Sequence, residues 1–528
     1  MCGISRSLKN VPKTSYFITT PIFYVNASPH IGHLYSALIA DASARFQKLI
    51  NPSINILFST GTDEHGLKVQ KAAEANKMSV DKYCDIISNS YRSTFQTFDV
   101  GHTSFIRTTS DRHKKCVSRF WDKIRPHMTE GKYTGWYCMA DETFLSEDQI
   151  ERTNDGVRVS KESGRPVEWA EEDNYKFDLR PFKEDLQNWL SDPHRIKPKV
   201  FHDILCREVN DLYEISLSRP KSRVDWGVPV PGDSGQTVYV WLDALVNYLT
   251  VSGYPDGGFW PPDVHVCGKD ILKFHGVFWP IFLIAAGLQL PKRIFVHSHW
   301  KVDDEKMSKT KGNVVDPVGA GRAYTESGLR YFLLREGTAH SDGNYSDVKI
   351  RRILNSELAD TMGNLLNRCC GKAINPHLIY HKSNPEAFMN LSTDPNFREL
   401  DQRLNKLADV VAGHYEELNF YKGIDEIVAT LQCCNRFFEH NRPWELAKSD
   451  DLDKLSSILH VTLETLRMSA ITLQPIVPAL ADRLLNKLNV DNRNWDQIKP
   501  NWIDNNEIVN PNCLQNKNII LFKRLIIS

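Results

Sequence analysis

The sequence has little that marks a disulfide-bonded or zinc-binding protein. It contains 11 cysteines, an odd number, and no two of them form a Cys-x-x-Cys pair. Scattered cysteines of this kind are typical of reduced thiols, so neither a disulfide framework nor a zinc ribbon is expected. An excess of charge is missing too, because 65 Lys and Arg balance 65 Asp and Glu. No overall electrostatic field therefore indicates a nucleic-acid partner.

Long hydrophobic runs are also missing. The longest one, from Phe274 to Leu290, contains His275, Pro280 and Gln289 and is short for a membrane span. We predict a buried core helix there and no association with a membrane.

The N-terminus lacks acidic residues. The first one is Asp41, whereas Arg6, Lys9 and Lys13 supply positive charge. This bias is typical of an organellar transit peptide, and a disordered basic N-terminus is the alternative.

What the sequence does contain is an alternation of strand-like and helix-like segments. The stretches "SYFITTPIFYVNA" (15–27) and "INILFST" (54–60) are β-branched and aromatic, which is typical of strands. After a region of mixed turn residues, aromatics and charges, the alternation returns at "VYVWLDALVNYL", and residues after Ser356 are helical nearly throughout. We predict an α/β fold, a Rossmann-type doubly wound parallel sheet split by an α+β insertion and followed by an all-α bundle. The expected boundaries are a basic segment at 1–15, the sheet domain at 16–129 and 237–300, the insertion at 130–236, a connecting region at 301–355 and the bundle at 356–528.

The stretch "SPHIGHLYSALIAD" (28–41) places His30 and His33 at the start of a predicted helix. Three interpretations are open: a metal site, a packed turn, or a phosphate site. No further metal ligand of a suitable type is obvious nearby. Strand, short turn and helix form the first half of a βαβ unit, in which the N–H groups and dipole of the helix N-terminus favour an anion.

A lysine-rich stretch, "DDEKMSKTKGNVVDP" (303–317), follows late in the sheet domain. HIGH at 30–33 and KMSKT at 306–310 together resemble the two signatures of class I aminoacyl-tRNA synthetases, with Thr310 in place of the family's serine. Four further stretches, "TPIFYVNASPHIGH", "GTDEHG", "VYVWLDALVNY" and "GKDILKFHGVFWP", are similar to methionyl-tRNA synthetases. The resemblance extends from Tyr16 to at least Trp444 and is to the bacterial and organellar branch.

This resemblance implies an aminoacyl-tRNA ligase that uses ATP with Mg²⁺ to activate L-methionine as methionyl-AMP. Charge develops on the phosphates, so the reaction depends on positioning and on cations more than on a nucleophilic side chain. The expected catalytic residues are His30, His33, Lys306 and Lys309. The expected ATP-binding residues are His30, Gly32, His33, Gly268, Asp270, Lys306, Met307, Ser308 and Lys309.

The resemblance also implies where methionine binds. Asp63 matches the residue that pairs with the substrate ammonium, and a structural helix N-cap is the alternative. The residues expected to bind the side chain are Ile22, Tyr24, Trp241, Ala244, Tyr248, Ile271, His275 and Trp279. Aromatic faces suit a polarizable sulfur. Because apolar pockets discriminate by only about 1–3 kcal/mol per methylene, homocysteine is an expected source of error.

The insertion carries zinc knuckles in many methionyl-tRNA synthetases. Here the matching stretch, "YTGWYCMADETF", has Cys138 alone and Asp141 in place of a second cysteine. We therefore expect no zinc and no other metal site.

Two helical stretches, "MGNLLNR" and "EHNRPWELAK", resemble anticodon-reading segments. Asn364 and Arg368 lie one turn apart, and Pro443 with Trp444 can present an indole for base stacking. By resemblance the anticodon is CAU; a core position is the alternative for Trp444. Acidic residues slightly outnumber basic ones after Ile353, so tRNA binding must depend on a local face.

The leading hypothesis is a methionine–tRNA ligase that charges tRNA(Met) for organellar translation. A nucleotidyltransferase with a HIGH motif would not use the long helical half. A non-catalytic RNA-binding relative would not need intact HIGH, KMSKT and Asp63. We expect a monomer, because no further tRNA-binding or dimerisation module is visible. The mitochondrial matrix is the expected location, and the cytoplasm is the alternative.

Overall fold

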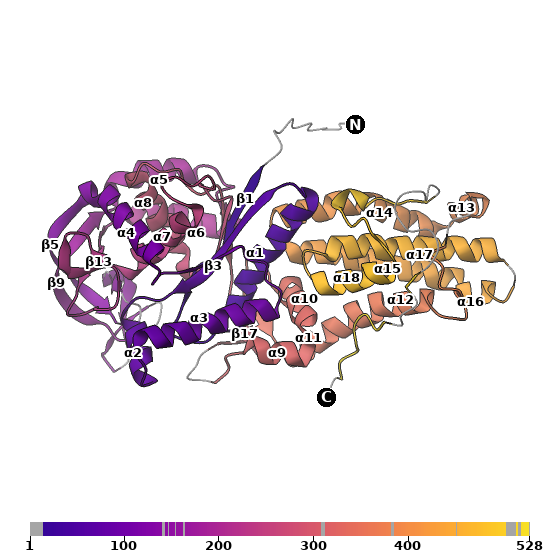
Figure 1. Cartoon of the computed structure of the whole chain (residues 1–528), viewed down its shortest axis with the longest axis horizontal. Helices are drawn as coiled ribbons and strands as arrows, with labels where there is room; N and C mark the ends of the chain where they lie inside the picture. The colour runs from indigo at the N-terminus through magenta and orange to yellow at the C-terminus, as the bar shows by residue number, and fades with distance from the viewer. Residues whose placement is uncertain are drawn as a thin grey trace. The chain divides into compact units, whose positions relative to one another are not determined.

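The structure is a computed structural model, which describes residues 14–139, 143–145, 147–153, 155–161, 164–307, 312–381, 385–449, 451–502, 514–515 and 519–526 (Figure 1). The chain divides into two compact units, which we describe separately. The first unit comprises Met1–Pro29, Asn55–Gln96 and Gly101–His297; the second comprises His30–Ile54, Thr97–Val100 and Ser298–Ser528.

A seven-stranded parallel sheet forms the centre of the first unit, as predicted. Its strand order is β10-β16-β15-β1-β3-β2, and β4 pairs with β3. The strand predicted over 15–27 is interrupted around Pro21, because proline has no N–H to donate to a neighbouring strand. The strands are β1 (Ser15–Thr19), β2 (Phe23–Tyr24), β3 (Asn55–Asp63), β4 (Ser104–Arg107), β10 (Ile196–Lys197), β15 (Val264–Gly268) and β16 (Ile294–His297).

The order of the strands reverses beside β1. The chain passes from β1 to β3 and β4 on one side, and returns as β15 and β16 on the other. Ligands of doubly wound sheets bind beyond the carboxyl ends of the strands at such a point. Asp63 ends β3 and Gly268 ends β15, so two predicted site residues lie at this edge.

Helices of the first unit bury a large aromatic and aliphatic core against the sheet, and α4, α7 and α8 lie side by side (Figure 1). The buried helix predicted from Phe274 is confirmed as far as Ala285, as a π-helix followed by an α-helix. The α- and π-helices are α2 (Leu67–Ala75), α3 (Val80–Thr97), α4 (Asp111–Ile124), α5 (Lys183–Leu190), α6 (Lys199–Glu208), α7 (Val240–Ser252), η6 (Phe274–Phe278) and α8 (Trp279–Ala285). Short 3-10 turns are η1 (Arg125–His127), η2 (Glu147–Gln149), η3 (Arg180–Phe182), η4 (Val209–Asp211) and η5 (Lys269–Ile271).

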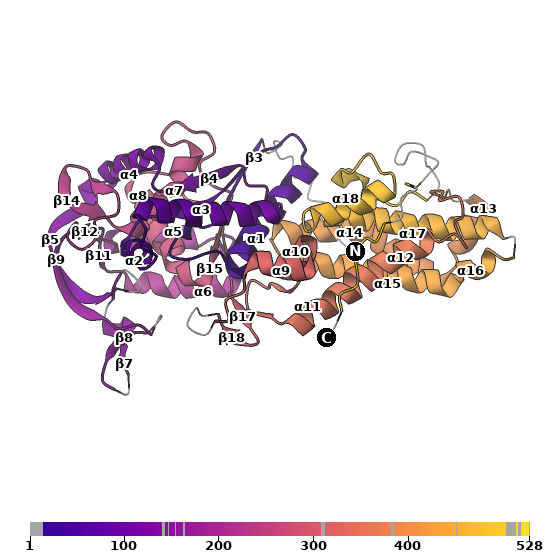
Figure 2. The ribbon, with the colours of Figure 1, turned by 60° about the horizontal axis from the view of Figure 1, so that its bottom comes forward.

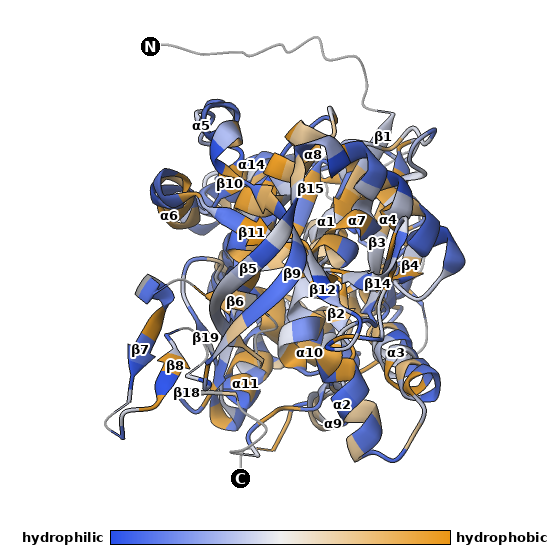
Figure 3. Cartoon of the chain, turned by 90° about the vertical axis from the view of Figure 1, so that its left-hand side faces the viewer, coloured by the Kyte–Doolittle hydropathy of each residue, from blue (hydrophilic) through white to orange (hydrophobic). Residues whose placement is uncertain are grey.

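The region of the predicted insertion is built on antiparallel strands. The long strands β5 and β9 pair with each other, and the β7–β8 hairpin projects beside them (Figure 2). Strand β9 is mostly hydrophilic, whereas the core strand β15 is hydrophobic (Figure 3). The range 130–236 also contains β10, which joins the parallel sheet of the core. The antiparallel strands are β5 (Met128–Cys138), β6 (Thr143–Leu145), β7 (Ile150–Arg152), β8 (Arg158–Ser160), β9 (Glu168–Asp178), β11 (Glu214–Ser216), β12 (Ser218–Pro220), β13 (Pro229–Val230) and β14 (Asp233–Val238).

The second unit combines a three-stranded sheet with the predicted helical bundle. A buried ion pair, with Nη2 of Arg330 2.6 Å from Oδ2 of Asp41, connects α1 (Ile31–Ile50) to α10 (Glu326–Glu336). The sheet consists of β17 (Trp300–Val302), β18 (Glu305–Lys306) and β19 (Gly343–Tyr345). The other helices are α9 (Pro317–Tyr324), α11 (Asp347–Ile353), η7 (Leu354–Gly363), α12 (Asn364–Cys369), α13 (Pro385–Leu391), α14 (Pro395–Glu416), α15 (Phe420–Asn441), α16 (Pro443–Leu446), α17 (Leu452–Leu473), α18 (Pro478–Lys487) and η8 (Trp495–Gln497).

Across the described residues, no helix combines the length and the apolar content needed to cross a membrane.

Candidate active site

The pocket predicted for the thioether has a wall of buried aromatic and imidazole rings in the first unit. The hydroxyl of Tyr248 lies 2.7 Å from Nε2 of His275, and Nδ1 of His275 lies 3.0 Å from the carbonyl oxygen of Ile271. Burial lowers the pKa of His275 to about 4, so the ring is neutral at neutral pH. Its Nδ1–H then donates to the carbonyl, and Tyr248 donates its hydroxyl proton to Nε2. Both ring nitrogens are therefore engaged in orienting the wall.

A second buried histidine, His265 on β15, completes this wall. The indole N–H of Trp279 donates to Nε2 of His265 at 3.3 Å, and Nδ1 of His265 lies 2.7 Å from the hydroxyl of Thr19. Burial, followed by the proximity of His275, lowers the pKa of His265 well below its usual range. The wall is thus uncharged although it contains two titratable rings.

Trp241 and Ile271 pack against the same hydrophobic cluster as Tyr248 and Trp279. The Trp241 indole stacks on Phe274 with ring centroids 3.6 Å apart and an interplanar angle of 8°. Ala244 is buried on the same helix, α7. Ile22 packs instead in a small separate cluster, with Phe17, Ile106 and Val251.

Asp63 is the last residue of β3, where its neighbour in the register is Tyr24 of β2. The N–H of Val25 donates to the carbonyl oxygen of Asp63 at 3.0 Å, and the residue is 9% exposed. The following helix, α2, begins at Leu67 with Gly66 as its N-cap, so the N-cap alternative for Asp63 is wrong. The Asp63 carboxylate therefore lies at a strand end, which is the usual place for a ligand-binding side chain in this fold.

The residues expected to hold adenosine follow β15 directly. Gly268 is the N-cap of η5, and Asp270 lies within that turn. A Cβ at Gly268 would stand 2.6 Å from Oδ1 of Asp270. Glycine at this position therefore allows the carboxylate to fold back over the end of the strand.

In the second unit, His30 and His33 begin α1. Nδ1 of His30 accepts the N–H of Gly32 at 3.1 Å, and Nδ1 of His33 accepts the N–H of His30 at 3.2 Å. The two rings stack with centroids 3.7 Å apart. Because both Nδ1 atoms accept, Nε2 is the protonated nitrogen of each neutral ring. The pair caps the helix and presents imidazole donors at its N-terminus.

Two residues contact the start of this helix: Met307, within the KMSKT stretch, and Val315, which follows it. The N–H of Ile31 donates to the carbonyl oxygen of Val315 at 3.2 Å. Cε of Met307 lies 3.9 Å from the point where a Cβ on Gly32 would stand. Lys306 ends β18. Ser308 and Lys309 lie outside the described residues, as does the side chain of Lys306.

The candidate anticodon residues meet in the helical bundle. The guanidinium of Arg368, on α12, lies 5.3 Å from the ring centroid of Trp444 and 4.7 Å from that of Phe438. It also forms a 2.6 Å ion pair with Glu439. Asn364 is exposed one turn before Arg368, and Trp444 is half-buried directly after the buried Pro443.

Two regions of the chain match known protein families. Residues 16–370 match the family described as tRNA synthetases class I (M), and residues 392–509 match the anticodon binding domain of methionyl tRNA ligase. The chain belongs to the class I methionyl-tRNA synthetases. It is 46% identical to the human mitochondrial methionine–tRNA ligase over 90% of this chain and 84% of that protein. A probable mitochondrial methionine–tRNA ligase of Dictyostelium discoideum is 42% identical over 92% and 88% of the two chains.

Among solved structures, a Mycobacterium tuberculosis methionyl-tRNA synthetase in complex with methionyl-adenylate has a similar fold. Its TM-score is 0.89 at 33% identity, and the match covers 97% of this chain and 100% of that one. The apo form of the mycobacterial synthetase matches with a TM-score of 0.82 at 30% identity, over 98% and 99% of the two chains.

Three residues of the candidate sites were not predicted from the sequence of this methionyl-tRNA synthetase: His265, Phe274 and Glu439. A single histidine or phenylalanine in an apolar segment is usually a core residue, and a glutamate on a helix is usually solvated. Only the position of Phe274, within "GKDILKFHGVFWP", could have pointed to the pocket.

The part of the chain that the structure describes contains no group of three or more His, Cys, Asp or Glu able to hold a metal ion. Cys138 is buried at the end of β5, whereas Asp141 lies outside the described residues.

Proposed function

We propose that this chain, like the ligases it resembles, activates L-methionine with ATP and charges tRNA(Met), and that it acts in mitochondria. The observation that carries this proposal is an uncharged aromatic pocket wall in the same unit as a strand-end carboxylate. An amino acid with a positive ammonium and an apolar, polarizable side chain fits these two features.

In the first step, a methionine carboxylate oxygen bonds to the α-phosphorus of ATP, and pyrophosphate leaves as the bond to the β-phosphate breaks. Asp63 pairs with the ammonium, and Asp270 with Gly268 binds the ribose and adenine side of the nucleotide. His30 and His33 donate to phosphate oxygens from Nε2 at the N-terminus of α1. Lys306 and Lys309 act on the phosphates from the KMSKT stretch, and Met307 and Ser308 of the same stretch bind ATP.

Mg²⁺ would accompany ATP as part of the substrate and would supply positive charge at the phosphates. We propose no zinc site, because Cys138 lacks a second cysteine at knuckle spacing.

The side chains that bind methionine in this proposal are Ile22, Tyr24, Trp241, Ala244, Tyr248, Ile271, His275 and Trp279. Both ring nitrogens of His275 already bond to protein groups, so its role is to orient Tyr248.

The second step transfers methionine to a tRNA with a CAU anticodon. Trp444 stacks on an anticodon base, and Asn364 and Arg368 bond to base edges. The bundle beyond Ser356 is the anticodon-binding domain, and the antiparallel strands within 130–236 form the insertion in the catalytic domain, whereas β10 belongs to the core sheet. We further propose that the protein is a monomer and that it is located in the mitochondrial matrix. The location is supported by the human and Dictyostelium discoideum ligases named above, which are mitochondrial.

The test is charging of tRNA transcripts by the purified protein. We expect methionine to be attached to a tRNA(Met) transcript with CAU, and little attachment when the anticodon is changed to another triplet. Equal charging of both transcripts would contradict the anticodon assignment. No methionylation of either would contradict the function.

A further inference from the structure

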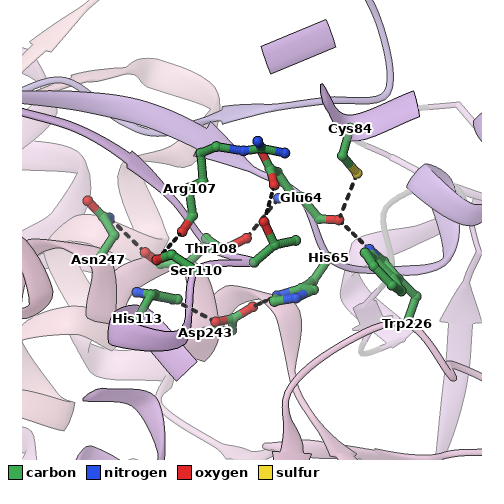
Figure 4. A network of polar contacts seen from close by, with 12 residues as sticks. Glu64, His65, Cys84, Arg107, Thr108, Ser110, His113, Trp226, Asp243 and Asn247 are labelled. Carbon is green, nitrogen blue, oxygen red and sulfur yellow. Dashed lines mark hydrogen bonds and ion pairs between the residues drawn. The ribbon is translucent and has the colours of Figure 1, made fainter. Parts of the chain in front are cut away.

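A buried carboxylate, Asp243, joins three elements of the first unit (Figure 4). It lies in the first turn of α7 and is 1% exposed. Its Oδ2 is 2.7 Å from Nδ1 of His65, which lies just beyond β3. Its Oδ1 is 2.8 Å from Nε2 of His113 on α4. One side chain thus connects a strand end and two helices.

The other ring nitrogen of His113 also contacts α7. Its Nδ1 lies 2.9 Å from the hydroxyl of Thr250, and this hydroxyl is placed to donate to the carbonyl oxygen of Val246 at 3.2 Å. His113 therefore links α4 to two turns of α7, at Asp243 and at Thr250.

The carboxyl group is held in its ionised form. Burial by itself raises the pKa of Asp243, but the charge of His65 and hydrogen bonds from His113 and His65 outweigh it. The net effect holds the pKa of Asp243 well below its usual range. A buried carboxylate between two imidazoles is strongly tied to both, since removing one partner would leave buried charge uncompensated.

The two ends of this connection stand beside residues of the methionine site. Asp243 directly precedes Ala244 and follows Trp241 by two positions, whereas His65 follows Asp63 by two. The strand end is held on its other side as well. The N–H of Glu64 donates to the hydroxyl of Thr108 at 2.9 Å, and the indole N–H of Trp226 donates to the carbonyl oxygen of Glu64 at 2.6 Å.

We propose that Asp243 is a positioning residue that sets the placement of α7, with the side-chain pocket, relative to the strand end that carries Asp63. This inference rests on the proposed function. The affinity for an amino acid that is bound at both its ammonium group and its side chain depends on the distance between the two binding points. Affinity for methionine, and its discrimination from homocysteine, therefore depend on the bridge from His65 through Asp243 to His113.

The variant Asp243→Asn keeps the size of the side chain and removes its charge. A matched control is Glu464→Gln, which removes the charge from another buried carboxylate, paired with Arg467 at 2.8 Å in α17 of the bundle. The measurement is methionine-dependent exchange of pyrophosphate into ATP, with KM determined separately for methionine and for ATP.

We expect Asp243→Asn to raise the KM for methionine on the order of 10-fold, which is less than the ~100-fold cost of a full 1 Å misplacement. The KM for ATP should stay within about 2-fold of wild type, because the nucleotide binds other residues. Selectivity for methionine over homocysteine should fall. Glu464→Gln should change none of these values. His113→Gln, which keeps an N–H donor but cannot carry charge, should give a smaller rise in the same direction.

The thermal stability of each variant is measured alongside, and His113→Gln supplies the test if Asp243→Asn does not fold. An unchanged KM for methionine in a folded variant would overturn the proposal. So would parallel rises in both KM values together with a lower Tm, which is the result of a purely structural role. Absence of methionine-dependent exchange in the unsubstituted protein would instead overturn the proposed function itself, and this inference with it.

Discussion

Two buried histidines determine the chemistry of the candidate pocket wall. His265 and His275 each use both ring nitrogens for bonds within the wall, to Thr19 and Trp279 and to Tyr248 and Ile271 respectively. Because burial lowers both pKa values, neither ring is charged at neutral pH. A wall of this kind offers polarizable surface to a thioether without attracting a charged side chain.

The low pKa of His275 predicts that it contributes to acid sensitivity. The folded value is about 4, against 6.5 for an ordinary histidine. Between these values the folded protein binds fewer protons than the unfolded chain, so stability falls as the pH decreases through this window. Because of this residue, the free energy of unfolding should decrease by about 2 kcal/mol between pH 7 and pH 5. In urea unfolding, this decrease should be about 2 kcal/mol smaller for His275→Gln than for wild type. An equal decrease in the two proteins would contradict the assignment.

Asp63 is expected to act mainly on binding. Changing Asp63 to Ala would remove the proposed ionic partner of the methionine ammonium, and charged hydrogen bonds contribute about 1.5–3 kcal/mol. The KM for methionine in pyrophosphate exchange should therefore rise by roughly 10- to 150-fold. The KM for ATP should change little. Asp63→Asn serves as the size-matched control and should lose nearly as much, whereas full activity of Asp63→Asn would show that charge is not what this position supplies.

At the scale of elements, the start of α1 depends on a glycine between two histidines. A Cβ on Gly32 would lie 2.9 Å from Cε1 of His30 and 3.0 Å from its Nδ1, so alanine must displace that ring. Gly32→Ala should therefore slow methionine-dependent exchange on the order of 100-fold, the effect of losing one preorganised donor.

The control for Gly32→Ala is Gly413→Ala, in α14. A Cβ there meets nothing within 4 Å, so activity should be unchanged and stability should increase by about 0.5–1 kcal/mol. Exchange at the wild-type rate by Gly32→Ala would remove the His30 ring from the phosphate site.

The short helix α16 is expected to read the anticodon through Trp444. One stacked base contributes about 1–3 kcal/mol, so Trp444→Ala should raise the KM for tRNA roughly 5- to 150-fold. Thermal stability and pyrophosphate exchange should stay near wild type, because the indole is half-buried and its neighbour Arg368 is also held by Glu439. Trp169→Ala, at an indole 58% exposed on β9 of the first unit, is the matched control. A drop in Tm and in both reaction steps would mean that Trp444 is a core residue.

At the scale of the whole molecule, the sequence predicted those elements whose pattern is locally strong. The sheet, the start of the HIGH helix, the buried helix at Phe274 and the final bundle all follow from hydrophobic periodicity and turn residues. Strand β10 has two residues and is paired only by tertiary context, so no local pattern marks it. The same holds for the bridge of Asp243 to His65 and His113, whose members are far apart in sequence and come together only through folding.

The candidate sites were predictable to the extent that motifs carried them. HIGH, "GTDEHG" and "WLDAL" located residues that the structure brings to strand ends and helix starts, whereas most of KMSKT lies outside the described residues. Periodicity could not separate Ile22 from the remaining pocket residues, although it packs in a different cluster. It also could not show that both ring nitrogens of His275 already bond within the protein, because hydrogen-bond partners depend on packing and not on local pattern.

The central claim is that this molecule activates methionine, and amino-acid-dependent exchange of labelled pyrophosphate into ATP tests it most directly. The purified protein is assayed with each of the twenty amino acids in turn, with Mg²⁺ and without tRNA. We predict strong exchange with methionine and only background exchange with the other nineteen, since the neutral aromatic wall and Asp63 together fit one apolar, sulfur-containing amino acid. Exchange that requires a different amino acid, or no exchange with any of them by folded protein, would contradict the account.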